Sequence, residues 1–132
     1  MSGEMDLEKL LSLLQPTLLP GVYVFCTVRN QSVLEVAKLQ PLATYLEQEG
    51  LSLLLKKDSA DAAGLEYTSE FKGITLAVHS SLDAVGFTAA VASKLALRGI
   101  SANVIAAHYH DHVFVPTDKA ELAMKVLTEF QK

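Results

Sequence analysis

The sequence has one cysteine, no tryptophan and no basic run, and these absences narrow the possible functions. Cys26 cannot form an internal disulfide, which favours a reducing cytoplasm. No stretch approaches the roughly 20 consecutive apolar residues that span a bilayer, and the acidic N-terminus lacks the basic region of a signal peptide. Because Lys and Arg do not cluster and the net charge is −4, nucleic acid is not an expected partner. The sequence therefore predicts a cytoplasmic protein that contacts neither nucleic acid nor membrane.

The remaining composition is that of a packed globular protein. Half of the 132 residues are hydrophobic and a fifth are charged, a balance that argues against disorder. A chain of this length forms one compact domain, or two small halves that share a core. Phosphate-binding glycine loops and the Gly-x-Ser-x-Gly turn of hydrolases are absent from the sequence. No cofactor is therefore expected.

Short patterns in the first half predict small elements. Leucines at helical spacing from Leu7 to Leu14 predict a helix that Pro16 ends. β-Branched and aromatic residues over 22–28 predict a buried strand. Residues 29–39 are predicted to be the segment with the least regular secondary structure. The other patterns predict a helix over 41–49, a strand over 51–55 and one or two helical turns over 58–63.

The second half has a clearer order of elements. Its patterns predict a strand over 73–79, a helix over 82–98, strands over 100–107 and 112–115, and a last helix from 116. This order is most of a ferredoxin-like βαββαβ pattern that lacks its last strand. Residues 22–28 are the obvious candidate for the missing strand.

Together these patterns predict an α+β, ferredoxin-like fold in two tandem halves, with helices on one face of an antiparallel sheet. Residues 1–65 form the first, shorter half, and residues 66–132 form the second. A small sheet with one bare face tends to cover that face with a second copy. We therefore expect a homodimer.

Two short motifs give the second half a resemblance to a known family. Asp83-Ala84-Val85-Gly86 at the start of the predicted helix and Gly99-Ile100 at its end resemble the core of the ACT domain. Segments 79–86 and 109–112 are similar to those of small bacterial proteins built from two ACT-like halves. More distantly, the layout is similar to that of the cytosolic arginine sensors of animal cells.

The resemblance implies a function as well as a fold. It makes residues 1–65 a shortened ACT-like half and residues 66–132 an ACT domain. It also implies a regulatory module that binds an amino acid and pairs through its sheets or helices, and it does not imply catalysis. Val85 departs from the pattern, because many ACT domains have Pro before the helix Gly.

The turn from Ser80 to Phe87 is the first candidate site. The backbone amides and partial positive charge of a helix N-terminus can hold a carboxylate, and Gly86 lets a ligand approach the backbone. Asp83 could then pair with the α-ammonium group. Alternatively, Ser80 and Asp83 only cap the helix, and Gly86 allows close packing.

Asn103 and His110 complete the candidate set. On a strand, the Asn103 side chain shares a face with Ile105, so a buried amide would need a partner from a ligand or from neighbouring backbone. His110 could line the same cleft. The predicted ligand-binding residues are Ser80, Ser81, Leu82, Asp83, Ala84, Val85, Gly86, Phe87, Asn103 and His110.

Histidines at alternating positions raise the alternative of a metal site. His108, His110 and His112 would share one face of a continuous strand and could bind zinc, but a tight turn near His110 and Asp111 would separate them. The other interpretation is a hairpin with local hydrogen bonds. On residue types alone, Ser81, His110 and Asp111 also permit a hydrolase. The leading hypothesis is a non-catalytic amino-acid sensor without a metal; the alternatives are a dimerisation module without ligand and a metal-dependent enzyme.

Overall fold

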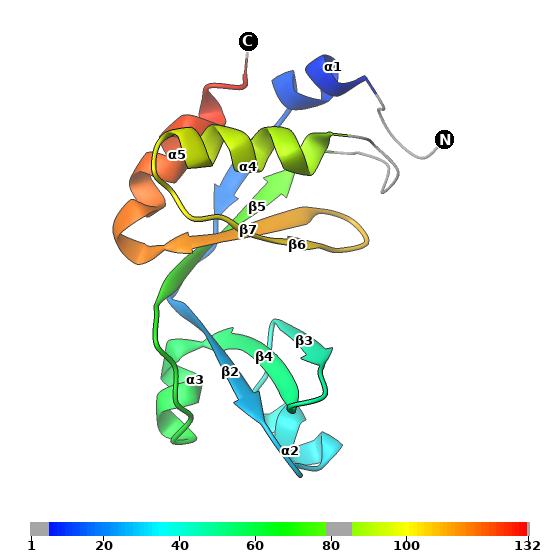
Figure 1. The fold of residues 1–132 in the computed structure, drawn as a ribbon, viewed down its shortest axis with the longest axis vertical. Coiled ribbons are helices and arrows are strands. Elements are labelled where there is room, and N and C mark those ends of the chain that lie inside the picture. Colours follow the sequence, from blue (N-terminus) through cyan, green and yellow to red (C-terminus); the bar gives the residue numbers. More distant parts are fainter. Residues whose placement is uncertain (1–5, 79–85, 132) are drawn as a thin grey trace. The chain divides into compact units, whose positions relative to one another are not determined.

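The computed structural model describes residues 6–78 and 86–131, which form two compact units (Figure 1). The terminal unit combines the first 20 residues with residues 72–132, and the inserted unit is Gly21–Phe71. The terminal unit is therefore discontinuous in sequence. No helix in the described part of the chain is long and apolar enough to cross a membrane.

The inserted unit is a three-stranded antiparallel sheet with two short helices. Its elements are β2 (Tyr23–Val28), α2 (Val33–Lys38), β3 (Ala43–Leu46), β4 (Leu51–Lys56) and α3 (Lys57–Ala62). The strand order is β3-β4-β2, and Val24 pairs with Leu55. Alternate residues of the strands face the helices, because successive side chains of a strand point to opposite faces. The buried core consists of Val24, Cys26, Val28, Leu53, Leu55 and Ala60.

The described residues of the terminal unit form four strands and a separate core. Its elements are α1 (Leu7–Ser12), β1 (Gln15–Leu18), β5 (Phe71–Ala77, whose first residue belongs to the inserted unit), α4 (Phe87–Leu97), β6 (Asn103–Ala106), β7 (Asp111–Pro116), a 3-10 turn (Thr117–Lys119) and α5 (Ala120–Thr128). The strand order is β1-β5-β7-β6, with β1–β5 and β6–β7 antiparallel.

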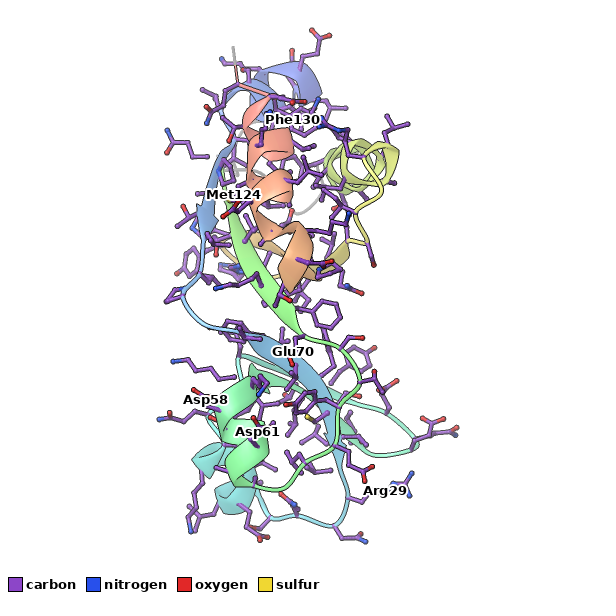
Figure 2. The ribbon with its side chains drawn as sticks, turned by 90° about the vertical axis from the view of Figure 1, so that its left-hand side faces the viewer. Arg29, Asp58, Asp61, Glu70, Met124 and Phe130 are labelled. Atoms are coloured by element: carbon purple, nitrogen blue, oxygen red, sulfur yellow. The ribbon has the colours of Figure 1, made fainter. Side chains whose placement is uncertain are left out.

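Helices α4 and α5 pack together over this sheet (Figure 1). Val91 and Leu95 of α4 and Val126 of α5 are fully buried in the core. Met124 and Phe130 pack against the same core from the C-terminal segment (Figure 2). The predicted α+β fold, two tandem ferredoxin-like halves with an antiparallel sheet and helices, is confirmed.

The structure overturns three predictions about individual elements, two of them through strand pairing. Residues 41–49, predicted as a helix, contain strand β3, because Ala43–Leu46 pair with Leu51–Leu54 across a tight turn. Residues 29–39 contain helix α2, which begins with a capping box that joins Ser32 and Glu35. The third correction concerns the missing strand: β1 pairs with β5 over four residue pairs, whereas strand 22–28 pairs with β5 only through Tyr23 and Phe71.

Candidate functional site

The predicted ligand-binding turn is described only at its end. Outside the described residues lie Ser80, Ser81, Leu82, Asp83, Ala84 and Val85. Gly86 and Phe87 are described, as are Asn103 and His110 on the other candidate elements.

Gly86 begins helix α4 with a left-handed backbone. Its φ is +89°, a conformation that favours glycine, and its carbonyl accepts a hydrogen bond from the Ala90 N–H at 2.9 Å. A Cβ at Gly86 would lie 3.2 Å from Leu7 Cδ2. Gly86 has no side chain to accept bonds from the first helical amides. The neighbouring Phe87 side chain is buried in the hydrophobic core, so its position is set by packing.

Asn103 has a partner within the protein. It opens β6 opposite Phe114 of β7, and its Nδ2 donates a hydrogen bond to the Phe114 carbonyl at 3.1 Å. The neighbouring backbone therefore satisfies this donor, which is one of the two alternatives that the sequence left open.

The histidine cluster lies on the β6–β7 hairpin, and the turn separates its members. His108 and His110 are exposed, whereas His112 is half-buried with its Nδ1 3.0 Å from Thr75 Oγ1. The Ala107 N–H donates to the His110 carbonyl across the turn. Within residues 6–78 and 86–131, no group of three His, Cys, Asp or Glu side chains is arranged to hold a metal ion.

Partial burial shifts the pKa values of two neighbouring residues on this hairpin. Burial lowers the pKa of His112, and the nearby His110 lowers that pKa further. Burial also raises the pKa of the adjacent Asp111 carboxyl, an effect that His112 and His110 oppose. Folding thus favours the neutral form of His112, whose ring still contacts the Thr75 hydroxyl.

The lowered pKa of His112 predicts a pH dependence of stability. The unfolded chain binds a proton on His112 more readily than the folded chain, so stability falls as pH drops through about 6.5 and stops falling below the folded pKa. We expect the decrease in Tm between about pH 7.5 and about pH 5.5 to shrink in His112→Asn, measured by circular dichroism. His108→Asn, which removes an exposed imidazole from the same hairpin, should retain the original dependence. An unchanged pH dependence in His112→Asn would contradict this assignment.

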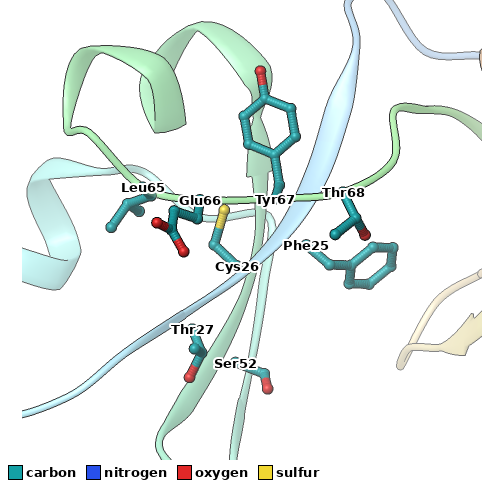
Figure 3. A pocket seen from close by; sticks show the side chains of 8 residues that line it. All are labelled: Phe25, Cys26, Thr27, Ser52, Leu65, Glu66, Tyr67 and Thr68. Carbon is teal, nitrogen blue, oxygen red and sulfur yellow. The ribbon is translucent and has the colours of Figure 1, made fainter.

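A groove in the inserted unit was not predicted from the sequence. It has a volume of about 680 Å³ and is open to solvent. Figure 3 shows the side chains that line it. Cys26, predicted as a core residue, is buried as expected, and burial raises the pKa of its thiol. No local motif marks the groove, because it is formed by strands β2 and β4 and by residues 65–68, which are distant from β2 in sequence. Its lining consists of Phe25, Cys26, Thr27, Ser52, Leu65, Glu66, Tyr67 and Thr68.

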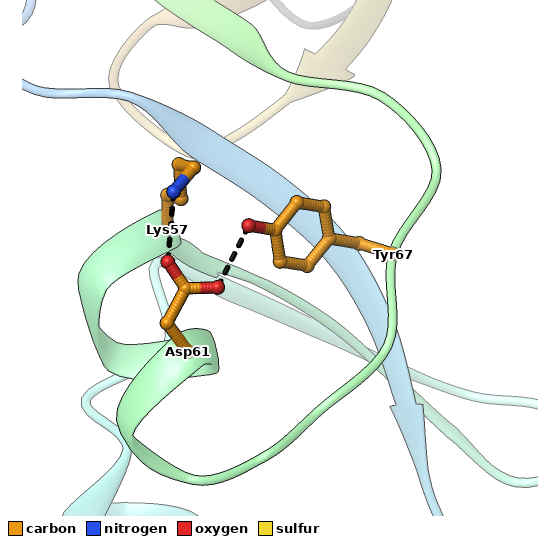
Figure 4. Close-up of polar contacts among 3 residues, drawn as sticks. All are labelled: Lys57, Asp61 and Tyr67. Carbon is orange, nitrogen blue, oxygen red and sulfur yellow. Dashed lines mark hydrogen bonds and ion pairs between the residues drawn. The ribbon is translucent and has the colours of Figure 1, made fainter.

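A polar cluster lies beside this groove (Figure 4). Lys57 Nζ is 2.8 Å from Asp61 Oδ2, and the Tyr67 hydroxyl donates to Asp61 Oδ1 at 2.7 Å. The hydrogen bond from Lys57, with that from Tyr67, lowers the pKa of the Asp61 carboxyl. The hydrogen bond that the Tyr67 hydroxyl donates to Asp61 raises the pKa of Tyr67. The cluster therefore ties the segment that contains Tyr67 to helix α3.

Comparison with protein families identifies the fold. Two family models, both describing an ACT domain, match this sequence over residues 2–72 and 68–129. The chain belongs to the ACT domain family. The resemblance carried by the Asp83–Gly86 and Gly99-Ile100 motifs is confirmed. ACT domains are regulatory, non-catalytic modules that generally bind small molecules, and this ACT protein is a regulatory ligand-binding module in that general sense.

Solved structures share the fold of this ACT protein. A Vibrio cholerae protein of unknown function, described as a possible transport protein, is 52% identical and aligns over 96% of each chain with a TM-score of 0.88. An Agrobacterium tumefaciens protein is 16% identical, covering 89% of this chain and 88% of its own with a TM-score of 0.69. The regulatory subunit of aspartate kinase from Thermus flavus is 12% identical, covering 87% and 95% with a TM-score of 0.62. The last two likenesses concern the fold alone. No curated protein matches the sequence.

Proposed function

We propose that this ACT protein senses a free amino acid at residues 80–87, where helix α4 begins. The observation that carries the proposal is Gly86, which has a left-handed backbone and no side chain at the N-cap of an 11-residue helix. A helix N-terminus favours an anion, so the ligand's carboxylate would bind the first amides of α4. Asp83 would pair with its ammonium group, and Asn103 and His110 would line the site.

Regulation would follow from a difference in ligand affinity between two arrangements of the protein. A ligand shifts such an equilibrium only by its differential affinity for the two states. ACT domains are non-catalytic, so we propose no reaction at this site. The cytoplasm remains the proposed compartment, which the single cysteine supports.

Thermal-shift measurements with each of the twenty amino acids at about 5 mM test the ligand. At about 100 times its Kd, a ligand should stabilise by about 2.7 kcal/mol and raise Tm by roughly 5–10 °C. Asp83→Ala should abolish this shift. Asp118→Ala, which removes an exposed acidic residue of the terminal unit, should retain it. No shift with any amino acid, or a full shift in Asp83→Ala, would reject the proposal.

We also propose a homodimer that forms through strand β3 of the inserted unit. This strand is the edge of its sheet, and its Tyr45 and Leu46 side chains are 74% and 79% exposed. Val33 and Leu34 of α2 are also exposed. Antiparallel pairing of β3 with its own copy would bond the open edge and bury apolar surface. This surface equally favours the alternative of a dimerisation module without ligand, which the thermal-shift experiment distinguishes.

Sedimentation velocity tests the dimer. Leu46→Lys places a charge at the proposed interface and should weaken association by at least about tenfold, since burying a leucine contributes about 1.5–3 kcal/mol. Leu97→Lys changes an exposed leucine at the end of α4 and should leave the dimer intact. A monomeric wild-type protein, or a dimer that is unaffected by Leu46→Lys, would reject this interface.

A further inference from the structure

Strand β2 of the inserted unit pairs with β5 at one residue pair, and the segment before β5 does not continue this pairing as far as Thr27. Tyr23 pairs with Phe71 in antiparallel register. Continuing this register would place Ser69 opposite Phe25 and Tyr67 opposite Thr27. Among the described residues Thr27 and Tyr67 do not pair, and the groove lies between β2 and the segment that contains Tyr67 (Figure 3).

Contacts with helix α3 hold the segment that contains Tyr67 in place. The Leu65 N–H donates to the Ala60 carbonyl at 2.9 Å, and the Tyr67 hydroxyl donates to Asp61 (Figure 4). Leu65 and Tyr67 also pack against the core of the inserted unit. The gap is therefore maintained by specific bonds to α3.

The edge of β2 offers backbone groups to the groove at Thr27. The Val22 carbonyl accepts a hydrogen bond from the Lys57 N–H on the β4 side. Because bonding direction alternates along an antiparallel strand, Val24 and Cys26 also bond toward β4, and the N–H and C=O of Thr27 point away from it. In the described part of the chain, no backbone group bonds to Thr27 on that side. One wall of the groove is thus an open strand edge.

The side chains around the groove favour a basic occupant with apolar groups. Phe25 is held edge-to-face against Phe71 at 5.3 Å and, with Leu65, supplies apolar surface. Glu66 is exposed, and the lining contains no Lys or Arg. The inserted unit carries seven acidic and four basic residues, with Asp58, Asp61 and Glu70 among the acidic ones (Figure 2).

We propose that this groove binds an extended, basic peptide segment of a partner protein, which adds as a strand at the edge of β2. Backbone bonds to Thr27 would give affinity, and alternate side chains would give specificity. A Lys or Arg of the peptide would approach Glu66, and its apolar residues would contact Phe25 and Leu65. This site lies in the inserted unit and does not depend on the amino-acid site proposed in the terminal unit.

Fluorescence polarisation of the full-length protein with a labelled Lys-Val-Lys-Val-Lys amide tests the proposal. We expect saturable binding below about 1 mM, and no binding of the Glu-Val-Glu-Val-Glu counterpart. N-methylation of the peptide backbone should reduce affinity about tenfold, because it removes strand hydrogen bonds. Thr27→Pro should also reduce affinity, because it removes the Thr27 N–H that would bond to the peptide. The pairing of β2 with β4 should remain, because the Thr27 N–H points away from β4. If Thr27→Pro fails to fold, the N-methylated peptide still tests the same bonds.

Charge is tested with a matched pair of variants. Glu66→Lys should weaken binding about three- to tenfold. Glu49→Lys makes the same change at an exposed position of the same unit outside the lining and should have a smaller effect. Three results would overturn the proposal: no peptide binding up to about 1 mM, binding that is insensitive to N-methylation, or equally tight binding of arginine amide, which would indicate a small-molecule site.

Discussion

Deletion of residues 1–20 is expected to unfold the terminal unit. Leu10 and Leu14 are fully buried in its core, and strand β1 pairs with β5 over four residue pairs. The Gln131 side-chain amide also donates to the Leu14 carbonyl at 2.8 Å. Losing a buried leucine costs about 2–5 kcal/mol, so losing both costs about as much as the whole stability of a small domain. Circular dichroism and the dispersion of amide NMR signals would measure the loss.

Point variants test whether the effect of the deletion comes from the loss of buried leucines or only from shortening the chain. Leu14→Ala should lower the free energy of unfolding by about 2–5 kcal/mol. Leu13→Ala makes the same change at a side chain that is 54% exposed and should cost less than about 0.5 kcal/mol. If the two variants were equally stable, or if the truncated chain kept the wild-type Tm, the N-terminal segment would not be part of this core.

Gly73→Ala is expected to destabilise the terminal unit by about 1–3 kcal/mol through overpacking. A Cβ at this position in β5 would lie 2.6 Å from Phe114 Cε2 and 3.0 Å from Leu19 Cδ1. Phe114 is 1% exposed, so its ring has little room to move. Urea unfolding at equilibrium would measure the change.

A double-mutant cycle tests the cause of this effect. In a Phe114→Leu background the smaller side chain leaves space, so Gly73→Ala should cost less there than in the wild type. Gly99→Ala is the control, because Gly99 has a φ of +72° and no heavy atom within 4 Å of an added Cβ. Its cost should come from backbone strain and be the same in both backgrounds. Additive effects of Gly73→Ala and Phe114→Leu would show that the clash is not the cause.

Residue types alone did not determine the contacts of the candidate functional residues. Alternating histidines suggested a metal site, but the hairpin turn leaves His108 and His110 exposed and sets His112 against Thr75. Asn103 needed a partner, and only the register of β6 with β7 identified it as the Phe114 carbonyl. The groove in the inserted unit carried no sequence signal, because it depends on where Tyr67 turns from β2 toward Asp61.

The sequence by itself determined the features that depend on neighbouring residues. Leucine spacing specified helix α1, β-branched and aromatic residues specified β2, a short apolar run specified β4, and the Gly86 and Gly99 motifs identified the family. Tertiary structure alone decided the features that depend on residues far apart. Residues 43–46 became a strand through pairing with β4, and β1 joined β5 across nearly half of the chain. Local propensities differ by about 1 kcal/mol or less, so long-range pairing and burial outweigh them wherever the two conflict.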